Sequence, residues 1–121
     1  MQLQHIGGEF SICRVGDLRR VDLSRPFLFI GRTDEELSVV CPTESAPEDA
    51  LARDDGWRAF RVAGTLDLSL TGVLARLSAT LAGAGVGIFA VSTYNTDYIL
   101  VKRGQLPRAV DALTAAGHTV L

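Results

Sequence analysis

The pattern of apolar and polar positions is clearest in the second half of the chain. Side chains alternate in character from residue 57 to residue 63, which indicates a strand. Apolar residues then recur at spacings of four and three positions, the period of an amphipathic helix: Leu70, Leu74, Leu77, Leu81 and Ala84. We expect Ser69 to cap the start of this helix and Gly83 and Gly85 to end it, because glycine adopts a left-handed conformation without strain.

Four further elements complete this half. Two apolar segments, residues 88–92 and 98–102, predict a hairpin, and residues 106–116 predict a second helix with Pro107 in its first turn. Residues 119–121 predict a last short strand. The order of strand, helix, strand, strand, helix and strand is that of ferredoxin-like α+β domains, so we expect this fold class.

The first half gives a weaker pattern. Residues 9–15 alternate as a strand would, and residues 27–30 and 37–41 predict two strands joined in a hairpin. Residues 17–23 fit one or two helical turns. The polar stretch after the hairpin predicts either a short helix around residues 47–53 or a linker between the two halves.

The hairpins of the two halves are similar in sequence. Residues 29–40 and 89–100 each hold an apolar strand, a threonine, a short polar turn, an acidic residue and a second apolar strand, if the second turn has one extra residue. This thin similarity fits both a duplication and chance. On the duplication hypothesis, residues 1–56 are a degenerate N-terminal module and residues 57–121 are a complete βαββαβ module.

Composition limits the partners and cofactors that we expect. The chain of 121 residues has 12 basic and 14 acidic side chains and a formal net charge of −2. A protein that binds nucleic acid through its phosphates instead gathers an excess of basic residues on one face. The histidines and cysteines also lack the spacing of metal ligands. We therefore expect no nucleic-acid binding, no metal and no cofactor.

The location follows from what the sequence lacks. No apolar run reaches the ~18 residues that a membrane helix needs, and the N-terminus lacks the basic and apolar regions of a signal peptide. We therefore expect a cytoplasmic protein with no membrane segment. Cys13 and Cys41 lie in separate apolar runs and fit buried, reduced side chains, with a disulfide between them as the alternative.

The candidate chemistry lies in two polar segments. The turn at residues 92–97 carries several hydroxyl side chains and the carboxylate of Asp97, which suits recognition of a small polar molecule. Asp97 either pairs with a cationic group of a ligand or accepts hydrogen bonds from its own turn. The loop at residues 67–73 leads into a helix, whose first amides either bind an anion or are satisfied by ordinary capping. Because no catalytic motif accompanies these segments, we expect a binding site and not an enzyme.

Four sequence segments occur in the order found in a known family: TDEELSVVCP at 33–42, WR at 57–58, DLSLTGV at 67–73 and STYNTDY at 92–98. Together they resemble the small bacterial ACT-domain proteins that are related to the regulatory part of aspartokinase and to the CASTOR arginine sensors of animals. The match is strongest in residues 27–42 and 57–117. It is loose in the rest of the first half.

The resemblance implies two tandem ACT-like modules, often dimerised, that bind an amino acid where modules meet. The implied ligand-binding residues are Leu70, Thr71, Gly72 and Val73 in the loop and Thr93, Tyr94 and Asp97 in the turn. Leu70 is apolar where the arginine sensors have an acidic side chain, so arginine selectivity is not implied. We expect a non-catalytic regulatory protein, a homodimer, that binds a small amino acid or related metabolite. The alternative is a ligand-free protein-interaction or regulatory subunit that acts on a partner enzyme.

Overall fold

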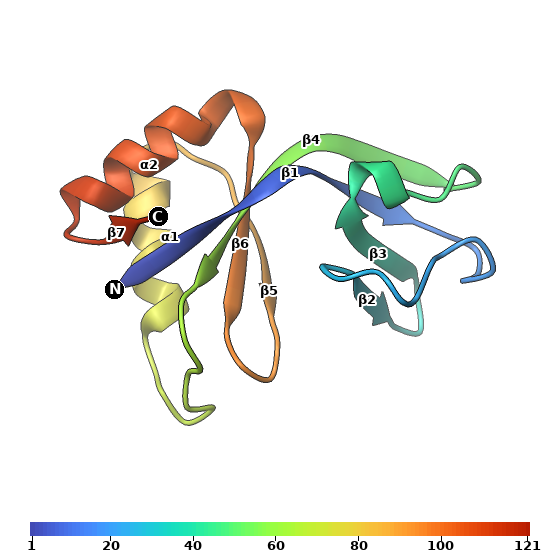
Figure 1. Ribbon diagram of the computed structural model, residues 1–121, viewed down its shortest axis with the longest axis horizontal. Coiled ribbons are helices and arrows are strands. Elements are labelled where there is room, and N and C mark those ends of the chain that lie inside the picture. The colour runs from blue at the N-terminus through green and yellow to red at the C-terminus, as the bar shows by residue number, and fades with distance from the viewer. The chain divides into compact units, whose positions relative to one another are not determined.

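Two long strands take part in both of the units into which the chain divides (Figure 1). The computed structural model describes residues 1–121. Its first unit comprises residues 1–7 and 58–121, and its second unit comprises residues 8–57. Strand β1 (Gln2–Arg14) and strand β4 (Ala52–Val62) each contribute one end to each unit. A chain divided after residue 56 would therefore be cut inside β4.

Each of these strands has a left-handed glycine beside the point where it passes between units. Gly8 in β1 has a φ of 81°, and Gly56 in β4 has a φ of 82°. This conformation is strained for a residue with a side chain but costs glycine little, as in β-bulges that contain glycine. The two glycines thus allow a local irregularity without ending either strand.

The first unit has the predicted ferredoxin-like order of elements. After β4 come α1 (Val73–Gly83), β5 (Phe89–Ser92), β6 (Asp97–Lys102), a 3-10 turn (Arg103–Gln105), α2 (Leu106–Ala115) and β7 (Thr119–Val120). The strands are hydrogen-bonded in the order β7-β1-β4-β6-β5. The start of β1, which was not predicted as a strand, lies between β7 and β4 and pairs in parallel with β7.

The core of the first unit lies between the two helices and one face of its sheet. Phe60 and Val62 are two positions apart on β4, as Ile99 and Val101 are on β6, so each pair points to the same face. Buried side chains from strands, helices and loops fill this core: Leu3, Phe60, Val62, Val73, Leu77, Leu81, Val86, Ile99, Val101, Ala109 and Leu113. The helical spacing that predicted α1 is therefore confirmed at Leu77 and Leu81.

The second unit has the strands of a ferredoxin-like domain but lacks its long helices. Strands β2 (Phe29–Arg32) and β3 (Leu37–Pro42) join β1 and β4 in the order β2-β3-β1-β4. Only a 3-10 turn, Thr43–Ser45, stands between β3 and β4, so the helix predicted around residues 47–53 is absent.

The helical turns predicted at residues 17–23 are also absent, and this segment forms turns and bends. The carboxylate of Asp17 accepts a hydrogen bond from the amide of Arg19, and that of Asp22 accepts one from the amide of Ser24, both at 3.0 Å. Such side-chain bonds offer the backbone an alternative to a helix. The helical prediction was wrong because it rested on the spacing of the apolar residues and not on the hydrogen bonds that Asp17 and Asp22 form with nearby amides.

Both cysteines are buried in the core of the second unit and are free thiols. Burial raises the pKa of Cys41 to about 11 and also raises that of Cys13. The cysteines therefore behave as inert, apolar core residues.

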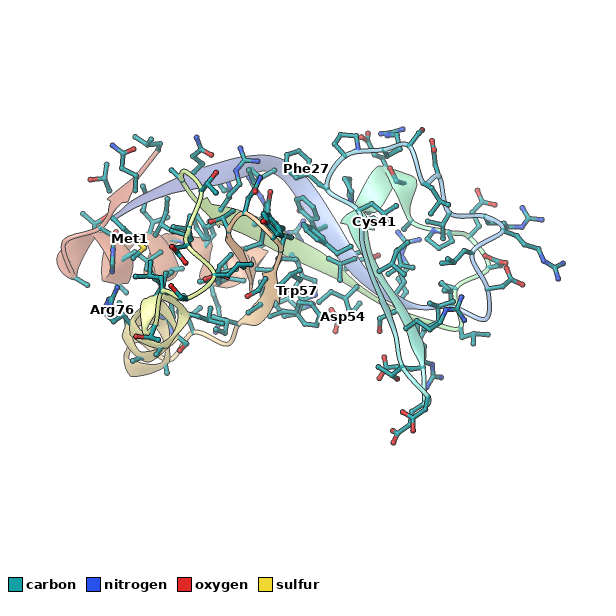
Figure 2. The ribbon with its side chains drawn as sticks, turned by 90° about the horizontal axis from the view of Figure 1, so that it is seen from below. Met1, Phe27, Cys41, Asp54, Trp57 and Arg76 are labelled. Carbon is teal, nitrogen blue, oxygen red and sulfur yellow. The ribbon has the colours of Figure 1, made fainter.

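The end of the second unit carries a hydrogen bond between two side chains of β4. The Trp57 indole nitrogen donates to a carboxylate oxygen of Asp54 at 3.1 Å, and the two side chains lie side by side in Figure 2.

The β2–β3 and β5–β6 hairpins share one register. Arg32 pairs with Leu37 as Ser92 pairs with Asp97, so each residue of the first hairpin corresponds to the residue sixty positions later. Both turns span four residues, and the extra residue expected in the second turn is absent. Asp97 therefore corresponds to the buried Leu37 and not to the acidic Glu36.

His5 on β1 has an environment that favours its neutral form. Its Nε2 atom lies 3.1 Å from a guanidinium nitrogen of Arg58, and its ring lies 5.5 Å from that of Phe60. The pKa of His5 is lowered, first by burial and then by the positive charge of Arg58.

We expect the free energy of unfolding to fall as the pH drops below about 6.5, the ordinary pKa of the His5 ring. The unfolded chain binds a proton there, whereas the folded protein binds it only at lower pH, so acid favours the unfolded state across that interval. Urea titrations between about pH 7.5 and 5.5 will measure the slope. His5→Gln should flatten it in part, since His118, whose pKa is also lowered, contributes the rest. An unchanged slope in the variant would contradict this assignment.

Candidate ligand-binding site

A cavity of about 290 Å³ lies in the first unit between the β4–α1 loop and the β5–β6 turn. Figure 1 shows this loop and this turn at the same end of the unit. The loop and α1 line the cavity with Leu66, Asp67, Leu68, Leu70, Gly72, Val73, Leu74 and Ala75, and the turn lines it with residues 92–97. The two polar segments singled out in the sequence are therefore the two walls of one cavity.

The structure brings most of the expected ligand-binding residues together. The cavity lining includes Leu70, Gly72, Val73, Thr93, Tyr94 and Asp97. Thr71 is exposed and is not among the lining residues. This convergence supports the expected site, while ligand contact by each residue stays a prediction.

Helix α1 presents its N-terminus to the cavity without a side-chain cap. The expected cap, Ser69, is wrong: the helix begins at Val73 after Gly72, whose φ is 82°. The first backbone bond of the helix runs from the Arg76 amide to the Gly72 carbonyl at 3.0 Å. The first-turn amides of Val73, Leu74 and Ala75, all three in the cavity wall, therefore have no acceptor in the protein. Free amides and the positive end of the helix dipole favour an anionic group at this wall.

Ser69 instead belongs to a turn closed by Asp67. The Ser69 amide and hydroxyl donate to one carboxylate oxygen of Asp67 at 2.8 Å and 2.7 Å. Both hydrogen bonds lower the pKa of Asp67, and the bond from the amide has the larger effect. The sequence Asp-Leu-Ser is a signature of such turns, and Asp67 is a lining residue that is not among the seven expected ligand-binding residues.

The opposite wall carries the Asp97 carboxylate. One oxygen of this half-buried carboxylate accepts a hydrogen bond from the Ser92 hydroxyl at 2.7 Å, and the other has no partner in the protein. The turn itself is closed by Thr93, whose amide and hydroxyl donate to the Thr96 carbonyl at 2.9 Å and 3.0 Å. Asp97 is therefore not needed to stabilise its own turn.

Thr96 fixes this turn to the end of β4. Its side chain is 5% exposed, and its hydroxyl donates to the Val62 carbonyl at 2.7 Å. The Asn95 carbonyl accepts a further hydrogen bond from the Leu66 amide at 2.7 Å. Two bonds from outside the hairpin thus hold the turn in place. Neither bond has a local signal in the sequence, because each joins segments about 30 residues apart.

The cavity wall is acidic. Asp67 and Asp97 are its charged side chains, and no lysine, arginine or histidine is among the lining residues. None of the salt bridges of the structure includes either carboxylate. The arrangement can therefore accept a cationic group beside a carboxylate and an anionic group at the helix amides.

The corresponding position of the second unit lacks this chemistry. Leu37, the counterpart of Asp97, is 6% exposed and packs in the core of its unit. No helix follows β1 in that unit, so no helix N-terminus faces the turn at residues 33–36. We therefore assign the candidate site to the first unit alone.

The fold and the cavity define a ferredoxin-like α+β domain with a small pocket between its first strand–helix loop and its hairpin turn. Residues 52–115, more than half of the chain, match the model of the ACT domain. The chain belongs to the ACT domain family, as its sequence motifs indicated. No helix of the structure combines the length and the apolar character that crossing a membrane requires.

Solved structures share this fold. A protein from Agobacterium tumefaciens is 34% identical, with a TM-score of 0.87 over 99% of this chain and 91% of that chain. A protein of unknown function from Vibrio cholerae, described as a possible transport protein, is 22% identical, with a TM-score of 0.74 over 92% and 85%. The ligand-free regulatory subunit of aspartate kinase from Thermus thermophilus is 10% identical, with a TM-score of 0.67 over 95% and 96%. No curated protein matches the chain.

Proposed function

We propose that this chain is a non-catalytic regulatory protein that binds an amino acid or a related metabolite in the cavity of its first unit. One observation carries the proposal: the uncapped amides of α1 and the half-free carboxylate of Asp97 line the same cavity. An α-amino acid carries a carboxylate and an ammonium group, which these two features complement. The cavity volume of about 290 Å³ lies at the lower end of ligand pockets and suits a small metabolite.

Membership of the ACT family supports a regulatory and ligand-binding role. The similarity in fold to a regulatory subunit of aspartate kinase is in keeping with this role. The free, buried cysteines are consistent with a protein of the reducing cytoplasm. Within the site, contact with the ligand falls to the six expected residues that line the cavity, with Asp97 as the partner of the ammonium group. Contact by Thr71, which lies outside the lining, rests on the family resemblance alone.

The two halves of the chain, residues 1–56 and 57–121, are on this proposal tandem ACT-like modules, the first of them degenerate. The shared hairpin register supports the duplication. The 3-10 turns Thr43–Ser45 and Arg103–Gln105 follow the two hairpins with the same displacement of sixty positions. The second unit also keeps the ferredoxin-like strand order. Residues 1–7 then complete the sheet of the C-terminal module.

A homodimer is the assembly that we propose for this protein. The resemblance to small ACT-domain proteins, which are often dimerised, is the basis for this assembly. Sedimentation equilibrium of the full chain will give the mass of the assembly. A monomer at all protein concentrations would reject the dimer and leave the cavity assignment in place.

Thermal-shift measurements with each of the common amino acids at millimolar concentration test the proposed function. A ligand present at about ten times its Kd should raise the Tm by roughly 5 °C, because it binds only the folded protein. The 70%, 54% and 79% exposed side chains of Leu68, Leu70 and Tyr94 favour the alternative, a ligand-free subunit that regulates a partner enzyme. The absence of stabilisation by any amino acid would reject the sensor and favour this alternative.

A further inference from the structure

The segment Asp67–Thr71 between β4 and α1 is bonded only to itself. The Ser69 amide and hydroxyl donate to the Asp67 carboxylate, and the Leu70 amide donates to the Asp67 carbonyl at 2.9 Å. No hydrogen bond or salt bridge joins this segment to the rest of the protein. Its shape is therefore set internally, while its position depends on its two ends.

The two ends of the segment are held in different ways. Before it, the Leu66 amide is bonded to the Asn95 carbonyl at 2.7 Å, which fixes the chain to the β5–β6 turn. After it, Gly72 has a φ of 82° and precedes the buried Val73, where the helix starts. A glycine can change its backbone angles more readily than any other residue. The segment thus runs from a point bonded to the β5–β6 turn to a glycine, whose φ can change while its carbonyl stays bonded to the Arg76 amide.

Two apolar side chains of the segment face both the cavity and the solvent. Leu68 and Leu70 line the cavity, yet they are 70% and 54% exposed. A single exposed leucine is ordinary on a protein surface. Two of them on one self-contained turn, across the cavity from the 79% exposed Tyr94, form apolar surface that an inward movement would bury.

We propose that Asp67–Thr71 is a lid that closes over an occupied cavity by rotation at Gly72. This inference rests on the proposed ligand-binding function and adds the way in which the site is regulated. Closure brings Leu68 and Leu70 onto the bound molecule and removes them from water. It also excludes water from the amides of α1, so that charged groups held there interact more strongly. The ligand then favours the closed state by its higher affinity for that state.

Hydrogen exchange of the full chain, with and without an equimolar mixture of the common L-amino acids, tests the lid. We expect the mixture to raise the Tm and to slow exchange of the amides of residues 67–71 by about tenfold or more. The turn at residues 33–36 in the second unit serves as an internal control, and its exchange should stay unchanged. Stabilisation without slower exchange at residues 67–71 would overturn the lid and leave the proposed function standing. Absence of any stabilisation would overturn both.

Substitution of one lid leucine provides an independent measurement. Leu70→Ser should weaken binding of the stabilising amino acid by about tenfold, because the closed state then buries less apolar surface. Leu51→Ser is the matched control, since Leu51 is 65% exposed and lies in the second unit. Both variants should unfold at the temperature of the unmodified protein. Equal affinities of the two variants would contradict the lid.

Discussion

Replacement of Asp97 by alanine should weaken amino-acid binding by about 1–3 kcal/mol, which is roughly 5- to 150-fold in affinity. The variant loses the one carboxylate of the hairpin wall and with it the partner of the ligand's ammonium group. The fold should persist, because the turn is closed by Thr93 and anchored by Thr96 without help from Asp97. Isothermal titration calorimetry, with the amino acid that gives the largest thermal shift, measures the loss.

Two companion variants separate charge at the site from charge in general. Asp34→Ala removes an exposed carboxylate from the corresponding turn of the second unit and should leave affinity unchanged. Asp97→Asn keeps an acceptor for the Ser92 hydroxyl but removes the charge, so it should bind nearly as weakly as the alanine variant. An unchanged affinity of Asp97→Ala for the amino acid would show that another part of the protein binds the ammonium group.

Leu3→Ala should lower the free energy of unfolding by about 2–5 kcal/mol, a large share of the stability of a typical domain. Leu3 is 1% exposed and belongs to the core of the first unit, although it lies near the start of the chain. It pairs with Val120 in the parallel β1–β7 ladder. Removal of its side chain leaves a cavity between the sheet and the helices, which the neighbours fill only in part.

Urea unfolding followed by circular dichroism measures this loss. Leu23→Ala is the matched control, because Leu23 is 64% exposed and should change stability by less than about 0.5 kcal/mol. A loss below about 1 kcal/mol for Leu3→Ala would show that the start of β1 is not part of the core.

The sequence predicted best those elements whose signals are local. The hairpin strands around the turn at residues 93–96 are short apolar runs, and α2 has Pro107 in its first turn and the left-handed Gly117 after its end. The start of β1 was missed because Gly7 and Gly8 interrupt its pattern and its partner, β7, lies at the other end of the chain. Pairing at that separation leaves no trace in a local window.

The candidate site was predictable in part for the same reason. Asp97 and the β4–α1 loop were found from their composition and from family resemblance, and the structure places both on one cavity. The start of α1 was placed too early because the Leu70 spacing fits a helix, whereas the bonds from Ser69 to Asp67 and the left-handed Gly72 delay the helix to Val73. This delay leaves the helix amides free.

The place of β1 also bears on how the protein is made. Residues 1–7 are synthesised before the rest of residues 1–121, yet one of their neighbours is β7, at residues 119–120, which is synthesised much later. The second unit, residues 8–57, is continuous in sequence and can form before the first unit is complete. During translation the start of β1 therefore lacks its β7 partner until residues 119–120 have emerged, and we expect this interval to be the one in which the newborn protein depends most on chaperones.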